Sequence, residues 1–133
     1  MGEVTARTRK RFAKAVEALE RAAALEALPE RAERDAVLLR FELAAELMPK
    51  TLQRILSERG ADVVLPKDVV RAARSANLVD EKTAEVLLAI VDDRNRMVHD
   101  YSEEFADELF ARAKSAYVHT LRNMLRSIET TNV

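Results

Sequence analysis

The side chains best suited to chemistry lie in one short stretch, from Asp93 to Tyr101, which reads DRNRMVHDY. It combines Arg, Asn, His and Tyr in a chain that has only two histidines and two tyrosines. A histidine exchanges a proton near neutral pH, and a guanidinium holds two oxygens of an anion at once. The stretch therefore has the residue types of a site that acts on a negatively charged group.

Helical spacing places these groups on or beside an apolar face. Val91 and Val98 belong to one line of a helix, and Arg94 stands on it, three residues after the first and four before the second. Asn95 and His99 are four apart and are neighbours on the adjacent face. An arginine facing a core loses its hydration unless a partner, a ligand or a second chain meets it. This pattern predicts a site.

A purely structural interpretation is also open. A histidine near the end of a helix can cap its last carbonyls, and an arginine one turn earlier can extend its charged end to water. The clustering of four polar residue types in one stretch favours a site over this alternative.

The elements that must position the cluster are helices, with bounds predicted from proline, glycine and capping residues. Pro29 ends the first helix and Gly60 follows the second, while Pro66 opens the third. Asp80 and Ser102 cap the helices before and after the cluster. We expect helices over residues 5–28, 30–59, 66–76 and 81–98, and from 103 to about 129, the last with Phe110, Tyr117 and Ile128 on its buried face.

These lengths predict an all-α fold, an up-and-down antiparallel bundle of about five helices. The 133 residues form a single helical-bundle domain, 1–133, with frayed ends at 1–4 and 130–133. Aromatic residues make up only 5% of the chain, and a core this thin favours further burial in a two-fold dimer.

Composition excludes several classes of function. The chain has no cysteine, no apolar run long enough to cross a membrane and no signal-peptide core, so we expect a cytoplasmic protein without membrane contact. The Glu-x-x-His pairs of di-metal bundles are absent, and two glycines cannot build a phosphate loop. We therefore expect no metal and no cofactor.

The motif at the end of the fourth predicted helix resembles a known family. The motif consists of Arg94, then His99 after four residues, then Tyr101 after one more. It is similar to the signature of the HEPN superfamily (higher eukaryotes and prokaryotes nucleotide-binding domain). The chain looks most like the prokaryotic branch encoded beside a minimal nucleotidyltransferase. Arg40-Phe41-Glu42, Glu46-Leu47 and Lys50-Thr51-Leu52 also resemble its second helix, although Ala44, Ala45, Met48 and Pro49 replace the family's usual bulky aromatics.

The resemblance implies a HEPN-like two-fold dimer in which the motifs of both subunits share a cleft. Many members are toxins that cleave RNA without a metal, and their nucleotidyltransferase antitoxin neutralises them, in some systems by AMP transfer. Carried over, Arg94 and His99 are the catalytic pair, with Asn95, Asp93 and Arg96 in support. Tyr101 is the AMP acceptor. The implied partners are a second copy, the minimal nucleotidyltransferase and RNA.

This chemistry is consistent with the residues. RNA cleavage needs a base for the 2′-hydroxyl, an acid for the leaving oxygen and positive charge at the phosphate. A dimer supplies two copies of His99 and two of Arg94. A non-catalytic subunit that binds substrate for the nucleotidyltransferase is the alternative function, and a purely structural bundle is the third possibility.

Overall fold

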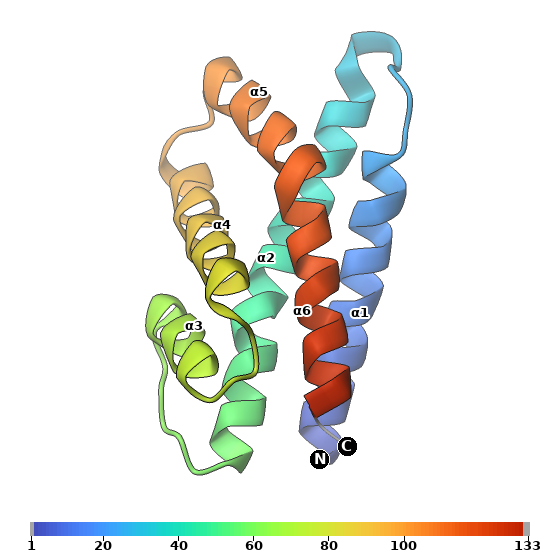
Figure 1. Ribbon diagram of the computed structural model, residues 1–133. Coiled ribbons are helices and arrows are strands. Elements are labelled where there is room, and N and C mark those ends of the chain that lie inside the picture. Colours follow the sequence, from blue (N-terminus) through green and yellow to red (C-terminus); the bar gives the residue numbers. More distant parts are fainter. Residues whose placement is uncertain (1, 132–133) are drawn as a thin grey trace.

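The computed structural model describes residues 2–131, in which helices are joined by short linkers and no strand occurs (Figure 1). The elements in chain order are α1 (Glu3–Ala23), η1 (Pro29–Arg31), α2 (Ala32–Glu58), α3 (Pro66–Ser75), α4 (Glu81–His99), α5 (Glu103–Arg112), the π-helical η2 (Ala113–Tyr117) and α6 (Val118–Thr131). The predicted all-α fold class is confirmed.

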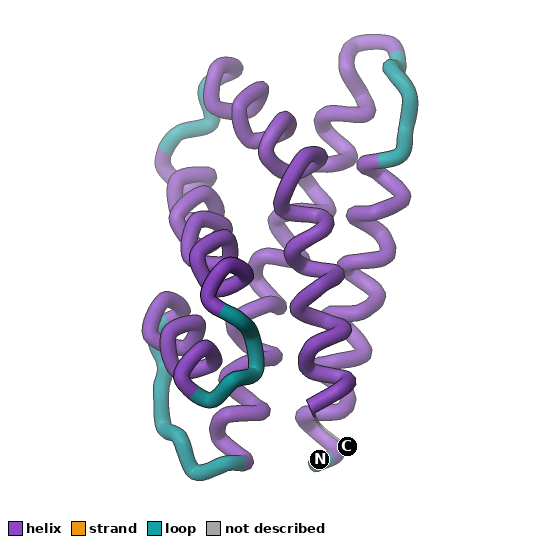
Figure 2. Tube along the Cα trace, viewed as in Figure 1, coloured by secondary structure: helices purple, strands orange, loops and turns teal. Residues whose placement is uncertain are grey.

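The long helices run antiparallel, and short linkers join them (Figure 2). α1 packs along α2, and α6 returns beside α1, so that both ends of the described chain lie at the same end of the bundle (Figure 1). α3 and α4 cover another side of α2, while α5 crosses the far end. The core is mainly aliphatic, with Phe12, Phe41 and Phe105 as its largest fully buried side chains.

Helix ends next to the cluster follow the predicted capping chemistry. Asp80 accepts a hydrogen bond from the Thr83 N–H at 2.7 Å, and Ser102 accepts one from the Phe105 N–H at 3.2 Å. Gly60 and Asn77 both adopt positive φ after their helices, at 85° and 60°. Asp80 and Ser102 thus fix where α4 and α5 begin, and Gly60 and Asn77 lie just after the ends of α2 and α3.

The connection between the first two helices differs from the prediction. α1 ends at Ala23 rather than at Leu28, and Leu28 is extended because Pro29 follows it. Glu30 and Arg31 then adopt left-handed conformations, so α2 begins at Ala32 rather than at residue 30. Leu28 is 43% exposed, so continuing α1 to that residue would have added little burial.

The last predicted helix is continuous but contains a π-helical turn. α5 passes into η2 and then α6, and Tyr117 and Ile128 are buried as expected, whereas Phe110 is only half-buried. Residues 3, 4, 130 and 131 of the predicted frayed ends are helical; residues 1, 132 and 133 lie outside the described range. Over residues 2–131, every helix is too short or too polar to cross a membrane.

Candidate active site

α4 carries the predicted cluster in its last turns and ends in a tightly bonded linker. The Asp100 N–H donates to the Arg96 carbonyl at 2.8 Å, which closes the helix. The Asp100 carboxylate accepts from the Ser102 N–H at 3.2 Å, and this bond, followed by that from Arg96, lowers the pKa of Asp100. Tyr101, between them, is 65% exposed. The linker therefore presents the tyrosine ring to solvent.

Arg94 stands where the apolar face of α4 leaves the core. Val91 is buried, but Val98 is 72% exposed, so the face expected to continue inward opens to solvent after Arg94. The Arg94 guanidinium pairs with Glu46, whose Oε2 lies 4.0 Å from Nη2. This is an ion pair without a hydrogen bond, and the buried Nε of Arg94 has no hydrogen-bond partner. The terminal nitrogens of this guanidinium, on a side chain that is 35% exposed, can therefore donate to a ligand.

A pocket of about 270 Å³ lies beside Arg94, between α2, the α2–α3 loop and α4. Arg94 and Asn95 line it from α4, and Glu46, Lys50 and Gln53 line it from α2. A smaller pocket of about 100 Å³, lined by Glu42, Arg94, Met97 and Val98, lies along the same two helices. Arg94 thus lies at the junction of two hollows on one face.

His99 is the last residue of α4 and is exposed, as is Asn95 one turn earlier. Arg94, Asn95, His99 and Tyr101 therefore lie along the outer side and the end of one helix. Both functional groups of the predicted catalytic pair can be reached from solvent.

Asp93 points the other way, into a hydrogen-bonded network with the π-helical turn. Its carboxylate accepts from Arg112 Nε at 2.9 Å and Nη2 at 3.0 Å, and from the Tyr117 hydroxyl at 2.5 Å. Burial, followed by the bond to Asp93, raises the pKa of Tyr117 well above its ordinary value. The network holds α4 against η2, one residue before Arg94.

Arg96 also makes structural contacts. Its guanidinium lies 4.4 Å from the centre of the Phe105 ring and donates to Asp100 from Nε at 3.2 Å and Nη2 at 3.0 Å. These contacts join the end of α4 to the start of α5. Of the three predicted supporting residues, Asn95 lines the pocket, whereas Asp93 and Arg96 lie outside it.

Sequence reasoning did not assign Glu46, Lys50 and Gln53 to the site. Their spacing along the second helix indicates an exposed strip, but no local signal shows that this strip lies against Arg94. Arg112 and Tyr117, the partners of Asp93, were missed for the same reason.

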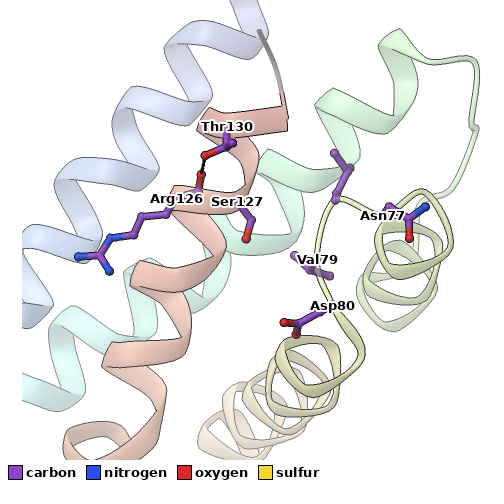
Figure 3. A pocket seen from close by; sticks show the side chains of 7 residues that line it. Asn77, Val79, Asp80, Arg126, Ser127 and Thr130 are labelled. Carbon is purple, nitrogen blue, oxygen red and sulfur yellow. Dashed lines mark hydrogen bonds between the residues drawn. The ribbon is translucent and has the colours of Figure 1, made fainter.

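A separate pocket of about 470 Å³ lies near the other end of α4, lined by residues of the α3–α4 turn and α6 (Figure 3). It contains none of the predicted site residues, and the Arg126 guanidinium extends away from it. Across the described residues, no group of three or more His, Asp or Glu side chains is arranged to hold a metal ion.

A comparison with known protein families relates nearly the whole chain to one of them. The family described as "Nucleotidyltransferase substrate binding protein like" matches residues 8–130, nearly the whole chain. The chain belongs to the nucleotidyltransferase substrate-binding protein family. The match includes the motif from Arg94 to Tyr101, and the predicted family is confirmed.

Solved structures place this nucleotidyltransferase substrate-binding protein among related bundles. A crystal structure from Thermus thermophilus is 36% identical, with a TM-score of 0.79 over 88% of this chain and 98% of that one. The tri-AMPylated Shewanella oneidensis HEPN toxin, in complex with its MNT antitoxin, is 14% identical, with a TM-score of 0.80 over 98% of this chain and 99% of that one. The fold is thus that of a HEPN protein. No curated protein matches the chain.

Proposed function

We propose that this protein is a metal-independent endoribonuclease, the HEPN toxin of a pair whose antitoxin is a minimal nucleotidyltransferase. The observation that carries the proposal is Arg94, whose partly exposed guanidinium is held, among the described residues, only by a 4.0 Å ion pair and lies beside a pocket on the face that ends in His99. An arginine with unused donors at a solvent-accessible hollow suits a phosphate.

The proposed reaction is attack of an RNA 2′-hydroxyl on the adjacent phosphorus. One His99 takes the hydroxyl proton, and a second His99 gives a proton to the departing 5′-oxygen. The O5′–P bond breaks, leaving a 2′,3′-cyclic phosphate and a free 5′-hydroxyl. Arg94 stabilises the extra negative charge on the phosphate oxygens in the transition state.

One chain provides a single Arg94 and a single His99, so the reaction requires two copies. The face beside Arg94 exposes large apolar side chains, with Val98 at 72% and Leu39 at 65%. Leu39 precedes Glu42 by one helical turn, and Glu42 and Val98 line the same pocket. We propose that this face pairs with its counterpart in a two-fold homodimer.

Tyr101 is the proposed acceptor of AMP. Its phenol is 65% exposed and lies two residues after His99, so an AMP group there would put phosphate and base at the catalytic histidine. The related HEPN toxin in complex with its MNT antitoxin is itself tri-AMPylated, which supports this assignment.

The deciding experiment incubates the purified protein with tRNA and with mRNA in EDTA, alongside a folded His99→Ala variant. We expect wild type to cut RNA and the variant to lose at least about 100-fold in rate, the usual contribution of a general acid or base. In a second arm, protein co-expressed with the nucleotidyltransferase should gain AMP by mass and lose activity. Tyr101→Phe should gain no AMP and stay active.

The family description supports a second candidate, a non-catalytic subunit that binds substrate for the nucleotidyltransferase. It predicts no RNA cleavage by the unmodified dimer. Equal cleavage by wild type and His99→Ala would contradict the proposed mechanism.

A further inference from the structure

We propose that the pocket between α2, the α2–α3 loop and α4 is a nucleobase subsite, and that Glu46 makes it prefer guanine. The inference rests on the proposed ribonuclease function, in which Arg94 holds the RNA phosphate next to the bound base. It adds a specificity site formed mainly by residues outside the Arg94–His99 motif.

The walls of the pocket suit the faces of a planar ring. Pro49 and Ala45 line it from α2, Val64 from the α2–α3 loop, Pro66 from the start of α3, and Val91 from α4. Ala45 and Pro49 are small, which leaves room between the helices. Enzymes that bind an unstacked base commonly enclose its faces between apolar side chains.

The polar groups of the pocket suit a base edge and a phosphate. Glu46 is an acceptor when ionised, and Gln53 and Asn95 offer both donors and acceptors. Pro49 has no N–H, so the helical hydrogen bond to the Ala45 carbonyl is missing and leaves one further acceptor. Arg94 and Lys50 supply positive charge for a phosphate.

This surplus of acceptors favours guanine. Guanine presents a ring N–H and an exocyclic amine side by side, which a single carboxylate can accept together. Uracil presents one ring N–H flanked by carbonyl oxygens, which repel a carboxylate. Glu46 is held by Lys50 at 3.2 Å and by the longer contact to Arg94, so its carboxylate is oriented before any base arrives.

The loop that carries Val64 is bonded to α2 through the neighbouring residue, Val63. The Gln53 side-chain amide donates to the Val63 carbonyl at 2.9 Å, which ties the loop to α2. Val64 lines the pocket yet is 71% exposed, as expected for a lip that a ligand would cover. Its neighbour Leu65 is 64% exposed and does not line the pocket.

The pocket is small for a ligand site. About 270 Å³ is slightly less than the roughly 300–1,000 Å³ typical of small-molecule sites. Proteins that read RNA sequence usually bind splayed bases of single strands in this way. The substrate class is therefore single-stranded RNA, with guanine next to the phosphate that Arg94 contacts.

The test measures binding of guanosine 3′-monophosphate and uridine 3′-monophosphate to the full-length protein by calorimetry. We expect wild type to bind the guanosine nucleotide about tenfold more tightly, the lower part of the range for a bidentate base contact. Glu46→Gln should reduce this ratio to near one. Glu42→Gln, which removes the same charge one turn away beside Arg94, should retain it.

A second pair of variants tests the wall. Val64→Ala should weaken guanosine nucleotide binding several-fold, while Leu65→Ala, at a similarly exposed neighbour outside the pocket, should not. The inference would be overturned if wild type bound both nucleotides equally tightly. It would also be overturned if Glu46→Gln and Glu42→Gln had the same ratio of guanosine to uridine nucleotide affinity. Equal effects of the two loop variants would also overturn it.

Failure of the subsite and failure of the ribonuclease are distinguishable, because this assay requires no cleavage. If the protein cuts no RNA but still prefers the guanosine nucleotide in a way that depends on Glu46, the subsite is supported and the ribonuclease function is wrong. If wild type cuts RNA, His99→Ala does not, and wild type shows no preference between the two nucleotides, the ribonuclease function is supported and the subsite is wrong.

Discussion

Two adjacent residues of α4, Asp93 and Arg94, contact different neighbouring elements and have different roles. The Asp93 side chain is only 13% exposed and accepts bonds from Arg112 and Tyr117, whereas Arg94 Nε has no partner. Removing Asp93 leaves the buried Tyr117 hydroxyl without its acceptor, a loss that typically costs about 1–3 kcal/mol, and takes a two-bond partner from Arg112. The motif therefore contains one stabilising residue and one residue available to a ligand.

We expect Asp93→Ala to lower the free energy of unfolding by about 2–3 kcal/mol in urea denaturation, since the Tyr117 hydroxyl and Arg112 lose their bonds. Asp92→Ala is the matched control. Asp92 is 60% exposed and pairs with Lys67 at the surface, so its loss should cost less than about 1 kcal/mol. Similar losses in both variants would show that the Asp93 network contributes little.

At the scale of elements, an ionic cluster fastens the start of α5 to the start of α2. Arg34 is only 11% exposed and donates to Glu103 at 2.7 Å and to Asp107 at 2.9 Å, and Arg31 also pairs with Asp107. These bonds lower the pKa of both carboxyl groups, and Arg34 is the largest cause for each. Since α5 follows directly after the Tyr101 linker, this cluster also holds one side of the site.

The lowered pKa values predict acid sensitivity. A carboxyl group with a lowered folded pKa stabilises the fold above its ordinary pKa, and this contribution disappears as the pH falls through the folded value. Wild type should therefore lose more unfolding free energy than Arg34→Met as the pH falls from 7 to about 3. Chemical denaturation at several pH values measures this, with Arg71→Met, an exposed arginine outside the cluster, as control. Identical pH profiles for wild type and Arg34→Met would contradict the prediction.

At the scale of the whole molecule, the proposed dimer would bury the exposed apolar face and would also supply the two copies of His99 that the proposed reaction requires. We expect Val98→Asp to give a monomer in light scattering and to lose RNA cleavage, although His99 is unchanged, because a buried charge opposes association. Val4→Asp, at an apolar residue on α1 that is 49% exposed, should remain a dimer. A dimeric, active Val98→Asp would place the interface elsewhere.

The helices near the site, and the motif they carry, could be predicted from the amino-acid sequence alone. Asp80, Ser102, Gly60 and Asn77 act through bonds and backbone angles within a few residues, so their effects are local and follow from the chain. The start of α2 at Ala32 could not be predicted, since the left-handed turn at residues 30 and 31 has no strong local signal. The spacing of the motif arginine and histidine is likewise a property of one helix.

What each motif residue contacts depends on how the helices pack in three dimensions. The pairing of α2 with α4 brings Glu46 and the α2–α3 loop beside Arg94, and the π-helical turn brings Tyr117 to Asp93. These contacts join residues 24 to 48 positions apart, and packing of the whole bundle sets them. Helical periodicity shows that two residues share a face, but which face meets which depends on how the helices bury their apolar surface together.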